Sequence, residues 1–312
     1  MEFYGFLHLE EQESSTVNVS VRSFRHKVLT YLQNAALLGR SLRDHGHEFH
    51  LLTNQRGLID QLAPSIAREL SLIEIEFVAR VPSGVRFFSG HYKVDVFRYL
   101  GNLPKGYRAL IDLDMLCVNF APESLADAEN NNTALYYDIT EQVVASSGEA
   151  HLRDQLEEIL GREVSLRWSG GEFLAGPPEF FAELTSAVDS IFDRYLEVSV
   201  GRYRVGNEPY QNAAIELLRE KGWDVRDAGE LGIVRRFWNM PVKHRQPPFR
   251  DFQNAFLLHL PVDKHILSLI YRFSPGRPEG YLTSYRLVRW LWLPVEVLQR
   301  FRGYISKRLS RQ

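Results

Sequence analysis

The chain has almost no cysteine and no long apolar run. Its 312 residues include a single cysteine, Cys117. One thiol excludes an internal disulfide and a zinc site built from cysteines, and it fits a reducing compartment such as the cytoplasm. No stretch is apolar for long enough to span a bilayer, and residues 1–10 lack the basic region and long apolar core of a signal peptide. We therefore expect a cytoplasmic location.

The sequence also has little net charge, with 37 basic residues against 39 acidic ones. This balance gives no reason to expect a nucleic-acid partner. With 45% hydrophobic residues, a chain of this length can bury one large domain or a domain with an appendage.

Apolar segments of strand length alternate with segments of helical periodicity. Strands are expected at 3–9 or 17–21, and at 48–53, 72–78, 107–111, 115–118, 133–137, 223–225 and 255–260, and the segment 168–175 contains glycine and then becomes apolar. Helices are expected at 24–45, 58–70, 90–103, 151–160, 178–198 and 210–222, and a surface loop at 237–252. This alternation predicts an α/β fold with a mostly parallel sheet flanked by helices. Ligands of such sheets bind beyond the carboxyl ends of the strands.

Two carboxylates, Asp112 and Asp114, interrupt the most apolar of these segments. The first follows an expected strand at 107–111, and the second precedes another at 115–118. Burying such a pair is costly unless positive charge neutralises it. A hard divalent cation carrying a diphosphate would do so, because Mg²⁺ and Mn²⁺ prefer carboxylate oxygens. The pattern Asp-x-Asp is common by chance, but its place at a strand end favours a Mn²⁺ or Mg²⁺ site.

A histidine, His259, ends another apolar segment, and Lys264 follows five residues later. An imidazole with two carboxylates is a plausible ligand set for Mn²⁺, although a strand-end histidine is often simply part of the core. Lys264 could neutralise phosphate as a compact cation, or it could be a solvated loop lysine.

Several segments resemble, in order, those of GT-A fold glycosyltransferases, above all glycosyltransferase family 8 with its lipopolysaccharide sugar transferases. The matching segments are 24–54, 91–104, 111–115, 168–171, 210–213 and 259–264. The resemblance spans about residues 1–270, and the order and spacing of the segments carry it. The chain departs from the family pattern in having Ser169 for Asn, Lys93 for Arg, Tyr210 for Asp with Glu208 nearby, and Val262-Asp263 where a Gly is expected.

The resemblance implies a role for each matching residue. Asp112, Asp114 and His259 would bind the metal. The donor would contact the metal-binding segment and residues around it, namely Lys93, Asp112, Leu113, Asp114, Gly170, Gly171 and Lys264.

Two further residues are candidates for catalysis. By the resemblance, Gln211 would lie beneath the anomeric carbon, where an amide can orient the sugar but cannot act as a base. Asp138, which follows the expected strand at 133–137, is a candidate for binding sugar hydroxyls. The alternatives are a tight turn at Gly170 and Gly171, a plain helix-start glutamine, and a helix-capping aspartate.

The activity implied is metal-dependent transfer of a sugar from a nucleotide-sugar donor, expected to be UDP-linked, to a glycan or glycolipid acceptor. Such a reaction would build a surface polysaccharide such as lipopolysaccharide or capsule, and it would retain the anomeric configuration. Two alternatives stay open. One is a sugar nucleotidyltransferase, which would normally carry a Gly-rich basic loop after its first strand. The other is a non-catalytic sugar-binding or nucleotide-binding scaffold.

The resemblance does not cover residues 271–312, which we expect to form a basic C-terminal helical tail that follows a linker at 272–280. Between 281 and 312 basic residues alternate with aromatic and leucine residues, and Pro294 would divide the segment into two short helices. A basic amphipathic helix suits the surface of an anionic membrane. We expect peripheral association with the inner face of the plasma membrane, where a lipid-linked acceptor would be found. The alternative is a terminal helix that packs on the catalytic domain.

Overall fold

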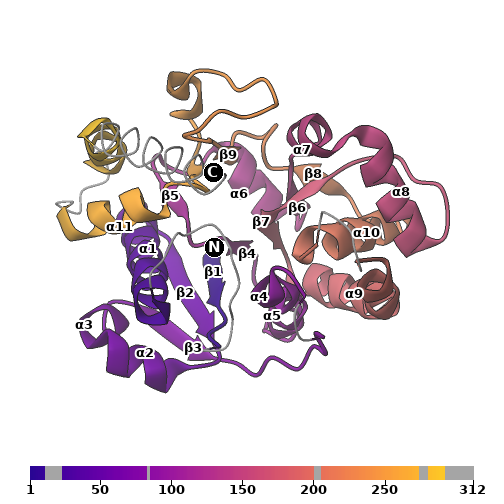
Figure 1. The fold of residues 1–312 in the computed structure, drawn as a ribbon, viewed down its shortest axis with the longest axis horizontal. Helices are drawn as coiled ribbons and strands as arrows, with labels where there is room; N and C mark the ends of the chain where they lie inside the picture. Colours follow the sequence, from indigo (N-terminus) through magenta and orange to yellow (C-terminus); the bar gives the residue numbers. More distant parts are fainter. Residues whose placement is uncertain (11–22, 83–84, 200–204, 274–279, 292–312) are drawn as a thin grey trace, which may run out of the picture.

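The computed structural model describes residues 1–10, 23–82, 85–199, 205–273 and 280–291 (Figure 1). The possible strand at 17–21, most of the expected linker at 272–280 and the break at Pro294 lie outside these residues.

A seven-stranded sheet forms the centre of the fold, in the order β3-β2-β1-β4-β7-β6-β8. These strands are β1 (Glu2–Leu7), β2 (Glu48–Thr53), β3 (Ser71–Glu74), β4 (Arg108–Ile111), β6 (Ala134–Asp138), β7 (Ser169–Gly176) and β8 (Val225–Asp227). Only β7 runs antiparallel to its neighbours, β4 and β6. The predicted α/β class with a mixed, mostly parallel sheet is confirmed.

A second, three-stranded sheet has the order β5-β10-β9. Its strands are β5 (Met115–Cys117), β9 (Val234–Arg236) and β10 (Leu257–His259). The chain leaves the large sheet at Ile111 and enters the small one at Met115, so the segment Asp112–Asp114 joins the two sheets.

Helices surround the sheets (Figure 1). They are α1 (Phe24–Asp44), α2 (Arg56–Leu62), α3 (Pro64–Ala67), α4 (Phe88–His91), α5 (Lys93–Gly101), α6 (Glu123–Asn130), α7 (Thr140–Ser147), α8 (Glu149–Leu160), α9 (Pro178–Ser199), α10 (Asn207–Glu220) and α11 (Lys264–Phe273), with a 3₁₀ turn at Phe249–Phe252. The long helix α1 begins at Ser23, whose Oγ accepts a hydrogen bond from the N–H of His26. It packs on β2, β5 and α11, whereas α9 packs on β7, α5 and α10.

Several expectations about local structure were wrong. The single helix expected at 58–70 is two helices, because Pro64 disfavours the helical conformation at Ala63, whose φ is −146° and ψ 59°. The helix expected at 90–103 is likewise divided into α4 and α5. Helices α6, α7 and α11 and strand β9 were not predicted.

The chain forms a further helix over residues 280–291, after α11. Its Tyr281 and Tyr285 are fully buried, and their hydroxyls donate to Asp44 (2.6 Å) and Asp263 (2.6 Å). The first part of the expected tail therefore packs on the rest of the chain. Within the described ranges, no helix is both long enough and apolar enough to cross a membrane.

Candidate functional site

The junction between the two sheets gathers the polar residues that the sequence singled out. Asp112 follows β4 at its carboxyl end, and its backbone N–H donates to the carbonyl of Glu172 on β7 (3.1 Å). On the other side, the N–H of Leu260 donates to the carbonyl of Asp114 (2.9 Å), which sets the end of β10 beside the segment. His259 is thus brought next to Asp114 by strand pairing, although 145 residues separate the two in sequence.

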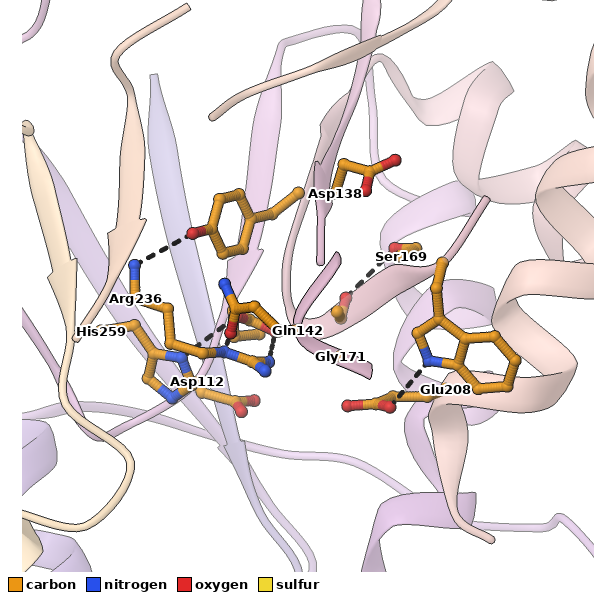
Figure 2. A network of polar contacts seen from close by, with 12 residues as sticks. Asp112, Asp138, Gln142, Ser169, Gly171, Glu208, Arg236 and His259 are labelled. Carbon is orange, nitrogen blue, oxygen red and sulfur yellow. Dashed lines mark hydrogen bonds and ion pairs between the residues drawn. The ribbon is translucent and has the colours of Figure 1, made fainter. Parts of the chain in front are cut away.

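The side chains of Asp112, Asp114 and His259 could hold one cation between them. Figure 2 shows Asp112 and His259 close together in this arrangement. Each offers one ligand atom, and these atoms lie within 4.8 Å of one another. His259 Nε2 is 3.2 Å from Asp114 Oδ1. Two carboxylates and one imidazole suit Mn²⁺ well and leave coordination positions for oxygen atoms of a ligand. The predicted metal ligands are therefore close enough to act together.

Two lysines neutralise the carboxylates. Lys93 Nζ lies 2.7 Å from Asp112 Oδ1 and also donates to the Gly171 carbonyl. Lys264 Nζ pairs with Asp114 Oδ2 and donates to the Pro261 carbonyl (2.8 Å). Burial alone would raise the pKa of Asp114, but the charges of Lys264 and His259 hold it well below its usual range. The lysines thus provide positive charge that neutralises these two carboxylates, as their apolar surroundings in the sequence led us to expect.

A third carboxylate, Glu172 on β7, lies behind His259 and is fully buried. Its Oε1 is 3.2 Å from His259 Nδ1, and Arg236 on β9 binds it through two nitrogens, with Nε at 2.6 Å from Oε1. Burial would raise the pKa of Glu172, but the charges of Arg236 and His259 lower it to about 2. Burial likewise opposes charge on His259, yet Asp114 and Glu172 raise its pKa to about 9.

Sequence reasoning missed both Glu172 and Arg236. For Glu172 a signal existed, since an acid that opens the apolar run Glu172–Ala175 poses the same burial problem as Asp112 and Asp114. Arg236 gave no such signal. It reaches the site because β9 pairs with β10 in the register that sets Arg236 opposite His259.

A cavity of about 510 Å³ opens over this junction. Its size suits a small-molecule ligand. Among its lining residues are six that the sequence proposed, namely Lys93, Asp112, Leu113, Asp114, His259 and Lys264. Its lining also includes residues that were not proposed, among them Asn207, Glu208, Arg236 and Trp238.

Glu208 contributes a further carboxylate to this cavity, from the first turn of α10. Its Oε2 accepts a hydrogen bond from Trp168 Nε1 (2.9 Å). In Figure 2, Glu208 lies across from Asp112, on the side of the site away from His259. The cavity therefore has a cation-binding side and a second acidic side.

The remaining candidates do not line the cavity. Gln211 is fully buried one turn further along α10, where its Nε2 donates to Ser169 Oγ (2.7 Å) and the Gly170 carbonyl (3.0 Å). Asp138 accepts hydrogen bonds from the N–H of Thr140 (2.8 Å) and the hydroxyl of Tyr136 (2.8 Å). Its carboxylate thus binds the N–H of the first residue of α7, whereas the residue directly before the helix is Ile139.

Gly170 and Gly171 leave room that protein side chains occupy. A Cβ at Gly170 would lie 2.0 Å from Glu172 Oε2, and a Cβ at Gly171 would lie 2.5 Å from Asn207 Nδ2. The absence of side chains here thus accommodates Glu172 and Asn207, rather than forming part of the cavity wall.

Comparison with known proteins gives matches among solved structures only. No known sequence family matches the chain, and no curated protein does. The galactosyltransferase LgtC in complex with donor and acceptor sugar analogs is similar at 13% identity and a TM-score of 0.47, covering 83% of this chain and 87% of that one. An active-site mutant of LgtC matches at 14% identity and 0.49, with the same coverage. Mouse xyloside xylosyltransferase 1 in its apo form matches at 12% identity and 0.44, covering 83% of this chain and 96% of its own.

Proposed function

We propose that the chain is a metal-dependent glycosyltransferase that uses a nucleotide-sugar donor, expected to be UDP-linked. One observation carries the proposal: Asp112, Asp114 and His259 converge at the carboxyl edge of the sheet and at the wall of a cavity. Lys93 and Lys264 lie beside them in the same wall. A divalent cation and a diphosphate are the ligand pair that needs both halves of this arrangement.

The two lysines have a role before and after the donor binds. In the metal-free arrangement each ammonium group neutralises one carboxylate. Asp112, Asp114 and His259 would hold Mn²⁺ or Mg²⁺, which would act as a Lewis acid and stabilise the leaving nucleoside diphosphate. Lys93 and Lys264 are then free to hydrogen-bond phosphate oxygens. The phosphate groups of the donor would thus replace the two carboxylates as partners of Lys93 and Lys264, which the protein already holds in place.

The sugar would lie toward Glu208, Arg236 and Trp238. A carboxylate such as Glu208 accepts hydrogen bonds from sugar hydroxyls, and the indole of Trp238 gives an apolar surface for a sugar ring. The hydrogen bond from Trp168 holds Glu208 in place for this task. The resemblance of the sequence implies retention of the anomeric configuration, which NMR of the product would test.

We propose a glycan or glycolipid acceptor of surface polysaccharide synthesis at the inner face of the plasma membrane. The helix at 280–291 supports a membrane location, because Leu287, Trp290 and Leu291 on it are more than half exposed. Arginines 286 and 289 lie on the same helix, and such a mixture suits an anionic bilayer. Vesicles containing anionic lipid should therefore retain the protein in sedimentation.

The first test is calorimetric titration with a panel of nucleoside diphosphates, with and without Mn²⁺, for the wild type and Asp114→Ala. Binding of UDP that requires Mn²⁺ and is lost in the variant is the expected result. Turnover of a UDP-sugar then distinguishes an enzyme from a scaffold that binds without reaction. Reaction of a sugar phosphate with a nucleoside triphosphate would instead identify a nucleotidyltransferase. Failure of every nucleotide to bind with metal would refute the proposal.

A further inference from the structure

Each ring nitrogen of His259 faces a carboxylate. Nε2 lies 3.2 Å from Asp114 Oδ1, at the cavity, and Nδ1 lies 3.2 Å from Glu172 Oε1, away from it. Carboxylates only accept hydrogen bonds, so both contacts are made by N–H groups when no cation is present. A metal-bound imidazole is neutral, and only the nitrogen without a proton can bind the metal. Nε2 is the nitrogen at the cavity, so the proton that stays is the one on Nδ1, which donates to Glu172.

Glu172 is itself fixed in place. It is fully buried, and Arg236 binds both of its oxygens. The Nε–H of Arg236 and the Nδ1–H of His259 share Oε1, so the carboxylate cannot rotate without losing hydrogen bonds. Because Glu172 stands on the large sheet and the other two on the small sheet, the three side chains also connect the sheets behind the metal site.

The backbone beside Glu172 is adapted to this arrangement. Gly170 precedes it by two residues on β7, and a Cβ there would lie 2.0 Å from Glu172 Oε2. Any other residue at this position would displace the carboxylate. The strand therefore leaves space for a buried charge that does not touch the cavity itself, since Glu172 is not among the lining residues.

We propose that Glu172 is a positioning residue for the metal: it holds the Nδ1 proton of His259 and so presents Nε2 to the cation, with Arg236 fixing its orientation. The inference rests on the proposed function in so far as it assumes a cation at this site. Removing such a partner of a metal-binding histidine typically costs about 10- to 100-fold in metal affinity. Glu172→Met tests this, because methionine is of similar length and offers no oxygen to accept the Nδ1–H of His259.

Glu172→Met leaves Arg236 buried without a counter-ion and could prevent folding. We therefore compare Arg236→Met, which keeps the Glu172–His259 contact, with the double variant Glu172→Met/Arg236→Met. Glu216→Met is the matched control, because Glu216 also pairs with an arginine, Arg219, and is not among the residues that line the cavity. Mn²⁺ affinity of the full chain is measured by electron paramagnetic resonance, with and without UDP.

The double variant should bind Mn²⁺ about 10- to 100-fold more weakly than Arg236→Met, and Glu216→Met should match the wild type. Equal affinity of the double variant and Arg236→Met would overturn the assignment of Glu172. The hydrogen bond from Nδ1 to Glu172 can be followed separately, because ¹⁵N NMR of the His259 ring in the metal-free protein reports the exchange of its Nδ1 proton. The Nδ1 proton should be protected from exchange with water in the wild type and in Arg236→Met, and lost to exchange in the double variant.

The NMR experiment also separates this inference from the function on which it rests. Should the wild type bind no Mn²⁺ even with UDP, the proposed function fails and the positioning of a metal fails with it. Protection of Nδ1 in the metal-free protein would still show that Glu172 orients the ring. Equal exchange in all variants would refute that orientation as well.

Discussion

Replacing Asp112 or Asp114 with asparagine should weaken metal binding in both cases, but the two substitutions should lower the free energy of unfolding by different amounts. Asp114 is 5% exposed and faces Lys264, which is 8% exposed. In Asp114→Asn the His259 ring can lose its proton, but the buried Lys264 ammonium keeps its charge. Removing one partner of a buried ion pair costs about 3–5 kcal/mol. Because His259 can become neutral in this variant, we expect the free energy of unfolding to fall by about 3 kcal/mol, the lower end of this range.

Asp112 meets different surroundings. Its side chain is 33% exposed, so water solvates part of the carboxylate, and its partner Lys93 keeps a second acceptor in the Gly171 carbonyl. Asp112→Asn loses one charge-assisted hydrogen bond that is partly screened by solvent. We expect a loss of about 1–2 kcal/mol.

Chemical denaturation of both variants in the presence of a chelator measures this difference. A second series with Mn²⁺ and UDP should stabilise the wild type by about 2.7 kcal/mol when the ligand is at a hundred times its dissociation constant, and neither variant by a comparable amount. Equal losses for the two variants without metal would refute the assignment of distinct environments. Stabilisation of either variant to the level of the wild type would refute its role as a metal ligand.

Three further changes test the charge arrangement. In the metal-free protein the pKa of His259 is raised from an ordinary 6.5 to about 9, so the stability that its charge provides is present below pH 6.5 and is lost as the pH rises to about 9. Between these two pH values, denaturation should show that the free energy of unfolding falls by about 3 kcal/mol more in the wild type than in His259→Gln. Lys264→Met should tighten binding of Mn²⁺ alone, because no ammonium group then competes for Asp114. In calorimetry it should weaken Mn²⁺-dependent binding of UDP about tenfold. If the variant bound neither Mn²⁺ nor UDP, a role of Lys264 in binding phosphate would be contradicted. Gly170→Ala should cost about 1–3 kcal/mol in thermal unfolding, since its Cβ would lie 2.0 Å from Glu172 Oε2, whereas Gly57→Ala, in open space, should cost nothing.

The sequence predicted those parts of the molecule that depend on local pattern. Alternating strand and helix segments gave the fold class, and Asp112 and Asp114 were noticed because charge is costly in an apolar run. The break at Pro64 was also a local signal, and it was overlooked. Arg236 could not be found this way, because only the register between β9 and β10 sets it opposite His259.

Helix α10 shows why the sequence alone does not tell which residues of a helix reach a cavity. Both Gln211 and Glu208 lie on it, and the sequence proposed Gln211 for a catalytic role, with a plain helix-start glutamine as the alternative. The structure places Glu208 in the first turn, at the cavity, and Gln211 one turn deeper, where it bonds to Ser169 and the backbone of β7. A sequence pattern gives the face of a helix, but the depth at which the helix meets a cavity depends on the packing of the whole domain.

The charges at the junction of the sheets explain why a cation and an anion would bind together. Three carboxylates face three basic side chains and a histidine, namely Asp112, Asp114 and Glu172 against Lys93, Lys264, Arg236 and His259. Without metal the carboxylates are neutralised within the protein, so a cation alone must displace ammonium groups from them. With a diphosphate present, those ammonium groups gain new partners, and the excess positive charge left by the cation is neutralised. We therefore expect a cation alone to bind more weakly than a cation that arrives with its diphosphate.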